Sequence, residues 1–167
     1  VGNFTQYDGH PFPGLALIRP DGTLDPTWNP PAGLTGNTVA AAQFLPDRSV
    51  FLTGRFTRAN GAPRDVVLRL KPDGTVDDAF DPGDELTVSP PPGFPRQTQA
   101  VSLAADGDGV FIASGAGINL PNGFVRRLDG TGRTDLNFRA TNAIFYGTPN
   151  VMVREPDAGG GLLVGGD

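Results

Sequence analysis

Cysteine is absent from this sequence and histidine occurs once, as His10. Disulfide bonds, thiolate metal sites and any site that needs two imidazoles are therefore excluded, although the compartment is not fixed by these absences. Glutamate is nearly absent too, with only Glu85 and Glu155, so aspartate supplies most of the acid. No apolar run approaches the ~18 residues that a transmembrane helix needs.

The charge balance is acidic, with 13 Lys and Arg against 18 Asp and Glu and a net charge of −5. This balance disfavours nucleic acids and anionic membranes as partners, since both reward basic patches. The 24 glycines and 17 prolines approach the level at which a chain is disordered. However, the apolar residues fall in short runs between turn residues, a pattern that favours a folded all-β chain.

A ten-residue pattern occurs three times, as RPDGTLDPTW (19–28), KPDGTVDDAF (71–80) and DGTGRTDLNF (129–138). We refer to these as the first, second and third copies. They share Gly at position four, Asp at position seven and an aromatic residue at position ten, with steps of 52 and 58 residues. This period lies just above the ~20–50 residues of common repeat architectures, so the repeat is expected to determine the fold.

Short strands separated by turn residues are predicted throughout, and no segment shows helical periodicity. The predicted strands are 39–45, 49–56, 65–71, 76–80, 100–105, 110–114, 123–128, 134–138, 151–154 and 162–165. Four strands per 50–60 residues are typical of a β-propeller blade. We predict an all-β, propeller-like array of about three four-stranded antiparallel blades in one partial domain (1–167), with units near 2–53, 54–114 and 115–166.

Turn chemistry accounts for most of the shared residues. Position four needs a positive φ, the Asp residues at positions three and seven are predicted to accept backbone N–H groups, and the aromatic residue is predicted to be a buried anchor. In the three copies these positions are Asp21, Gly22, Asp25 and Trp28; Asp73, Gly74, Asp77 and Phe80; and Thr131, Gly132, Asp135 and Phe138. Thr131 replaces the first Asp and is predicted to weaken that turn.

The pattern Leu-x-x-Asp-Gly-x-x-Asp-x-x-Phe, preceded by a Gly-x-Phe step, resembles the delta-60 repeat, a bacterial β-propeller repeat family. The second copy fits it fully through Leu70 and the four residues named above, preceded by Gly54-Arg55-Phe56. The first copy has Ile18 in place of Leu and Trp28 in place of Phe, and follows Gly2-Asn3-Phe4. Before the third copy the Gly-x-Phe step is reduced to Gly115-Ala116-Gly117. The resemblance implies an extracellular or cell-surface protein of bacteria, and it brings no catalytic residue.

Aspartate pairs at short spacing raise the alternative of a calcium site. The pairs are Asp21 with Asp25, Asp73 with Asp77 and Asp78, and Asp106 with Asp108. Calcium needs about 6–8 oxygen ligands, and no stretch resembles an EF-hand loop. Because one Asp recurs at a fixed repeat position, turn closure is the favoured interpretation, and we predict no metal or cofactor site.

The sequence contains none of the common catalytic motifs that we considered. Glu155 is predicted in a hairpin turn, and His10 in a loop over 7–13 with no Gly-x-Ser-x-Gly motif. The triple glycine 159–161 lacks the Lys-Ser/Thr of a phosphate loop and is predicted to be a hairpin turn. A glycosidase needs two facing carboxylates, which remain possible only if distant Asp residues converge. We therefore predict no catalytic residue.

Loop position gives the one clue to binding. In a four-stranded blade the tight turns at 46–48 and 72–74 share one face, and the long loops at 29–37, 57–64, 81–97 and 139–148 share the other. Binding residues concentrate on loops held by a rigid scaffold. The candidates for a binding face are Tyr7, Phe94, Arg96 and Tyr146. A functionless insertion is the alternative interpretation of 81–97.

Two function classes follow from these patterns. The first is a non-catalytic binding or structural module of an exported bacterial protein, with a glycan or protein ligand. The second is a carbohydrate-active hydrolase or lyase. Propellers typically have ~4–8 blades, so three blades would leave apolar faces uncovered. The expected partners are therefore the rest of a longer chain or further copies, since two copies make six blades.

Overall fold

The computed structural model describes residues 4–11, 14–31, 34, 38–55, 58–59, 62–63, 66–83, 86, 100–115, 123–138, 148–155 and 160–167. Over these residues the regular structure is entirely antiparallel β, and no helix is long and apolar enough to cross a membrane. The strands are β1 (Gln6–Tyr7), β2 (His10–Pro11), β3 (Thr38–Phe44), β4 (Val50–Arg55), β5 (Arg58–Ala59), β6 (Ala62–Pro63), β7 (Val67–Leu70), β8 (Ala100–Asp106), β9 (Gly109–Ser114), β10 (Phe124–Leu128), β11 (Pro149–Arg154) and β12 (Leu162–Gly166). The all-β prediction is confirmed.

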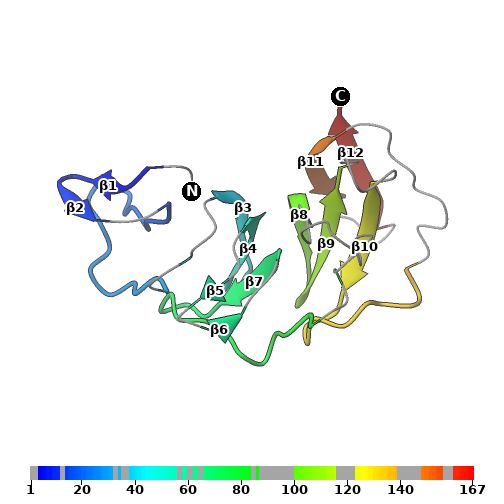
Figure 1. Ribbon diagram of the computed structural model, residues 1–167, viewed down its shortest axis with the longest axis horizontal. Helices are drawn as coiled ribbons and strands as arrows, with labels where there is room; N and C mark the ends of the chain where they lie inside the picture. The colour runs from blue at the N-terminus through cyan, green and yellow to red at the C-terminus, as the bar shows by residue number, and fades with distance from the viewer. Residues whose placement is uncertain are drawn as a thin grey trace, which may run out of the picture.

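The sheets follow one another along an open arc (Figure 1). The hairpin of β1 and β2 lies at one end, and the hairpin of β11 and β12 lies at the other. Between them stand blade A, with strand order β3-β4-β7, and blade B, with strand order β8-β9-β10. We call the β11–β12 sheet blade C. The propeller-like arrangement of successive antiparallel sheets is therefore confirmed.

The fourth strand of blades A and B is shorter than predicted. It is a single antiparallel bridge, Leu70↔Val76 in blade A and Leu128↔Thr134 in blade B, with the equivalent Ile18↔Leu24 in the first copy. After the bridge the chain turns, because the carboxylate at position seven accepts the backbone N–H two residues further on. A local side-chain acceptor thus ends the strand that residues 76–80 and 134–138 were predicted to form.

The three blades share the same register. The first strand of each has a β-bulge or irregularity near its start, in β3, β8 and β11. Beyond that point Ala42 pairs with Leu52, Leu103 with Ile112, and Met152 with Val164. Residues of different blades can therefore be placed in equivalent positions one by one.

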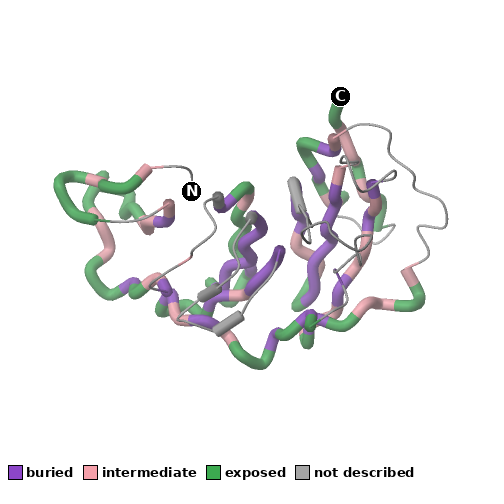
Figure 2. The backbone as a smooth tube through the Cα atoms, in the orientation of Figure 1, coloured by how far each residue is buried: buried purple, intermediate pink, exposed green. Residues whose placement is uncertain are grey.

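The hydrophobic core lies between successive sheets, so the central strands of blades A and B are buried on both faces (Figure 2). Along β4, Val50 and Leu52 face the first unit, whereas Phe51 faces blade B. In β9 every residue is buried. The cluster between blades A and B consists of Leu45, Phe51, Val66, Val67, Phe80, Leu86, Leu103, Val110, Ile112 and Leu128. Such two-sided burial explains why the central strands are almost purely apolar.

The position-ten aromatic residues occupy equivalent positions. The Phe80 ring meets Phe51 edge-on with centroids 5.0 Å apart, and Phe138 meets Phe111 in the same way, also at 5.0 Å. Trp28 is buried between the first unit and blade A, and Phe138 is half-buried between blades B and C. The prediction of a buried anchor is confirmed for Trp28 and Phe80, whereas Phe138 lies at the equivalent position but is only half-buried.

Candidate functional site

The repeated Asp-Gly segment begins with a turn that is closed by a carboxylate. Oδ1 of Asp21 accepts the backbone N–H of Thr23 at 2.9 Å and its hydroxyl at 2.7 Å. Asp73 binds Thr75 with the same two distances. These are Asx-turns, as predicted, with the threonine hydroxyl as a second donor.

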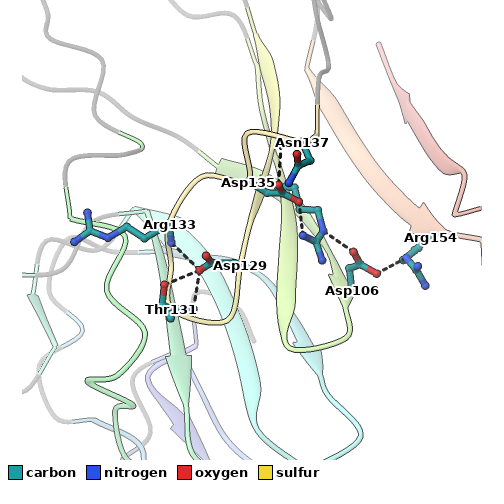
Figure 3. A network of polar contacts seen from close by, with 8 residues as sticks. Asp106, Asp129, Thr131, Arg133, Asp135, Asn137 and Arg154 are labelled. Carbon is teal, nitrogen blue, oxygen red and sulfur yellow. Dashed lines mark hydrogen bonds and ion pairs between the residues drawn. The ribbon is translucent and has the colours of Figure 1, made fainter.

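The third copy restores this turn in another way. Asp129 stands two residues before Thr131, and its Oδ1 accepts the Thr131 N–H at 2.8 Å and the Arg133 N–H at 3.1 Å (Figure 3). Arg133 occupies position five, where Thr23 and Thr75 donate in the other copies. The prediction that Thr131 weakens the turn is wrong, because Asp129 supplies the acceptor from position one.

A second turn follows at position seven. Oδ1 of Asp25, Asp77 and Asp135 accepts the N–H two residues later at 2.9, 3.1 and 2.8 Å. The backbone N–H of the same Asp donates to the strand before the turn, for example from Asp77 to the Arg69 carbonyl at 2.9 Å. Both carboxylates of the pattern therefore hold backbone donors, which explains their spacing without a metal.

Hydrogen bonds of this kind lower the pKa of six carboxyls in the chain. For Asp21 the Thr23 hydroxyl is the main cause, and for Asp135 it is the backbone N–H of Asn137, followed by Arg127. The same direction holds for Asp25, Asp47, Asp73 and Asp129. A general acid at neutral pH needs a raised pKa, so these six groups are shifted away from that role.

The lowered pKa values predict a loss of stability in acid. A carboxyl whose folded-state pKa lies below its ordinary 3.8 binds fewer protons in the folded than in the unfolded chain. Its contribution is therefore fully present above that value and is lost as pH falls through the lower folded-state pKa. We expect the free energy of unfolding, measured by urea titration from pH 7 to pH 2, to decrease below about pH 4.

Salt provides the control for this prediction. The main causes of the shifts are short hydrogen bonds, so the acid loss should persist in 1 M NaCl, where the Debye length is about 3 Å. Asp73→Asn should shrink the pH dependence. A stability that stays flat or rises below pH 4 would contradict the assignment.

The glycine at position four lies where one copy of the pattern contacts the preceding copy, and we call this contact the joint. Gly74 has a φ of +87°, and a Cβ there would lie 2.9 Å from both the Asn29 nitrogen and Trp28 Nε1. The Asn29 N–H donates to the Asp73 carbonyl at 2.8 Å, and the Asp81 N–H donates to Thr131 at 3.0 Å in the next step. In each case a carbonyl of the turn accepts the backbone N–H of the residue that directly follows the aromatic anchor of the preceding copy. Sequence reasoning identified the turn but missed this contact.

Arginines pair with carboxylates near these turns, and one of them, Arg154, joins blade C to blade B (Figure 3). Arg127 contacts Asp135 and Asp106, at 2.6 Å each. Nε of Arg154, on β11, lies 2.6 Å from the other Asp106 oxygen, as an ion pair without a well-aligned hydrogen bond. Burial lowers the pKa of Arg127, but the hydrogen bonds to the two carboxylates outweigh it and raise the pKa. Asp106 is therefore paired with two cations and is poorly suited to calcium.

Other predicted site residues lie apart from this network. His10 is exposed and pairs with Tyr7 across the β1–β2 hairpin, so its predicted loop placement is wrong. The Tyr7 hydroxyl donates to the Gly22 carbonyl at 2.9 Å. Glu155 is exposed directly after β11, and its N–H donates to the Gly161 carbonyl. Residues 156–159 of its predicted hairpin turn lie outside the described residues. The loop over 57–64 contains the short β5–β6 hairpin, equivalent to β1–β2.

Several candidates fall outside the described residues: Glu85, Phe94, Arg96, Tyr146 and Gly159. Of the predicted loop at 81–97, the structure describes 81–83 and Leu86, and Leu86 is buried in the cluster between blades A and B. Over the part of the chain that is described, no group of three or more His, Cys, Asp or Glu residues is placed to hold a metal ion.

Comparison with known families agrees with this architecture. The family described as "Domain of unknown function (DUF5122) beta-propeller" matches residues 1–27 and 45–80. The match supports a β-propeller repeat family. Each matched segment contains one of the Asp-Gly turns, at Asp21-Gly22 and at Asp73-Gly74. Searches of curated proteins and of solved structures find no match.

Proposed function

We propose that this chain is a non-catalytic binding or structural module of an exported bacterial protein, built from delta-60-type repeats, which presents loops from a β-propeller scaffold. The observation that supports this most is the use of its acids. The repeated carboxylates accept backbone N–H groups inside the turns, and Asp106 is paired with two arginines. These groups serve the scaffold, which leaves recognition to the loops.

The loop at 81–97 is the proposed binding element. Its start is fixed to the scaffold, because the Asp81 N–H bonds to the Thr131 carbonyl and both Pro82 and Leu86 are buried. The residues that follow include Phe94 and Arg96, an aromatic group and a cation suited to stacking on a sugar or to contacts with a protein.

A carbohydrate-active hydrolase or lyase is the alternative. It requires two carboxyls roughly 5–10 Å apart, one of them with a raised pKa. Six carboxyls of this chain have a lowered pKa instead, which favours binding over catalysis.

Deleting residues 87–97 and closing the gap with two glycines tests this proposal. Leu86 is retained because it belongs to the core. On a glycan array and in binding titrations, we expect the deletion to weaken ligand binding at least about tenfold, or 1.4 kcal/mol, without unfolding the protein. Leu136→Asp, on an exposed turn elsewhere, serves as the matched control and should bind normally. Turnover of a polysaccharide that survives the deletion but disappears with a single Asp→Asn substitution would establish the enzyme instead.

A further inference from the structure

One face of blade C exposes an apolar surface, which we call the rear patch: Val151, Val153 and Leu163. Their exposed fractions are 52%, 53% and 72%. The opposite face of the same hairpin packs Met152, Leu162 and Val164 against blade B. Strand alternation therefore places the rear patch on the side away from blade B.

Because the three blades share one register, each residue of the rear patch can be compared with its equivalent in blades A and B. Leu163 is equivalent to Phe51 of blade A and Phe111 of blade B, which are 0% and 4% exposed. Val153 is equivalent to Ala104, which is 2% exposed. In blades A and B, this face is covered by the sheet that follows. In blade C no described residue covers it.

A second exposed surface lies on β3, and we call it the front patch: Ala42 and Phe44. Phe44 is 55% exposed, and Ala42 is also exposed. In blade B the equivalent residues are Leu103, which is 6% exposed, and Ala105, and both pack against blade A. The front and rear patches are thus the two halves of an interface that is buried between blades A and B.

The backbone edges are complementary in the same way. Among the described strands, β12 pairs only with β11, so its second edge has no partner. Residues 15–18 correspond to β7, 52 residues later, yet no described strand pairs with them in the ladder that β4 forms with β7. In blade A, Phe51 pairs with Arg69. The equivalent pair across the open edges is Leu163 with Leu17.

We infer that two copies of this chain associate head to tail, with the rear patch of each copy covering the front patch of the other and β12 pairing with residues 15–18 of its partner. Within one copy, blade B stands between the sheets that carry the two patches (Figure 1), so neither patch covers the other. Such a heterologous contact closes into a ring when the rotation allows it. Two copies give six blades, within the ~4–8 of closed propellers.

Mass measurement tests the assembly. Sedimentation equilibrium of the 167-residue chain should give twice its 17.4 kDa. Leu163→Asp and Phe44→Asp should each give monomers with an unchanged β-sheet circular dichroism spectrum, because both side chains are exposed. Leu136→Asp, at a residue that is 82% exposed and outside both patches, should leave the dimer intact. A monomeric native chain, an assembly larger than a dimer, or dimerisation that tolerates both patch substitutions would overturn the inference.

Cross-linking tests the register. The chain has no cysteine, so introduced thiols are the only ones present. Mixing Leu17→Cys with Leu163→Cys under oxidation should give a covalent dimer, because directly paired residues bring Cα atoms within the ~4.4–6.8 Å that a disulfide spans. Ile18→Cys is the control, since its side chain lies on the other face and should not link to residue 163. Equal yields with residues 17 and 18, or a bond within one chain of the double variant, would refute the pairing.

Discussion

Replacing Phe80 with alanine is expected to lower the free energy of unfolding by about 3–5 kcal/mol. The side chain is 1% exposed and lies between blades A and B. Its ring meets Phe51 edge-on, and the Arg69 guanidinium lies 5.5 Å from its centroid. Truncation therefore removes apolar burial, an aromatic pair and a cation–π contact at once.

Urea unfolding followed by far-ultraviolet circular dichroism would measure this loss. Leu136→Ala is the matched control, because Leu136 belongs to the third copy of the same pattern but is 82% exposed. It should change stability by less than about 0.5 kcal/mol. A Phe80→Ala protein that unfolds at the native urea concentration would show that the anchor is not what joins the blades.

The aromatic anchors could be predicted from the sequence because they recur at the same position of the repeated pattern. A large aromatic residue that returns at position ten marks one structural role, and Trp28, Phe80 and Phe138 all lie between consecutive sheets. The strands of blades A and B were predicted to within about two residues for the same reason, since apolar runs bounded by turn residues define them. The positions of the anchors and strands can therefore be predicted from the repeat alone, without knowing which residues are in contact in the folded chain.

The fourth strands were predicted to be too long because the same residues favour both an extended strand and a turn closed by an aspartate. Val76 and Phe80 follow a strand-like pattern, but the Asp77 carboxylate captures the Ala79 N–H and turns the chain first. The role of Asp129 was missed because the third copy moves its acceptor by two positions. Which acceptor reaches a given N–H depends on backbone geometry that letter-by-letter alignment does not contain.

The candidate site was predicted only in part for a related reason. The pairing of Asp106 with Arg127 and Arg154 joins residues 21 and 48 positions away, and nothing in the repeat marks it. The joint at Gly74 likewise needs contacts with Trp28 and Asn29 from the preceding copy. Loops at 81–97 and 139–148 do not repeat, so periodicity assigns them no role. Position in the repeat predicts the scaffold, whereas recognition depends on the segments that differ between units.

Gly74→Ala is expected to destabilise the protein more than Gly22→Ala, although both glycines occupy position four with nearly equal φ angles, +87° and +86°. An alanine in this left-handed region costs about 1–2 kcal/mol. At Gly22 nothing lies within 4 Å of the added Cβ, so only this backbone cost applies. At Gly74 the Cβ would lie 2.9 Å from the Asn29 nitrogen and from Trp28, which adds about 1–3 kcal/mol of overpacking.

Trp28 is the only tryptophan, so its fluorescence reports directly on this joint. In Gly74→Ala we expect the emission of the folded protein to shift to longer wavelength, because the clash separates the buried indole from the second turn. Gly22→Ala should keep the native emission while unfolding at a lower urea concentration. Equal losses of stability with native emission in both variants would mean that the glycine serves the turn alone, and that the successive copies are held together by their apolar faces without the backbone contact from Asn29 to Asp73.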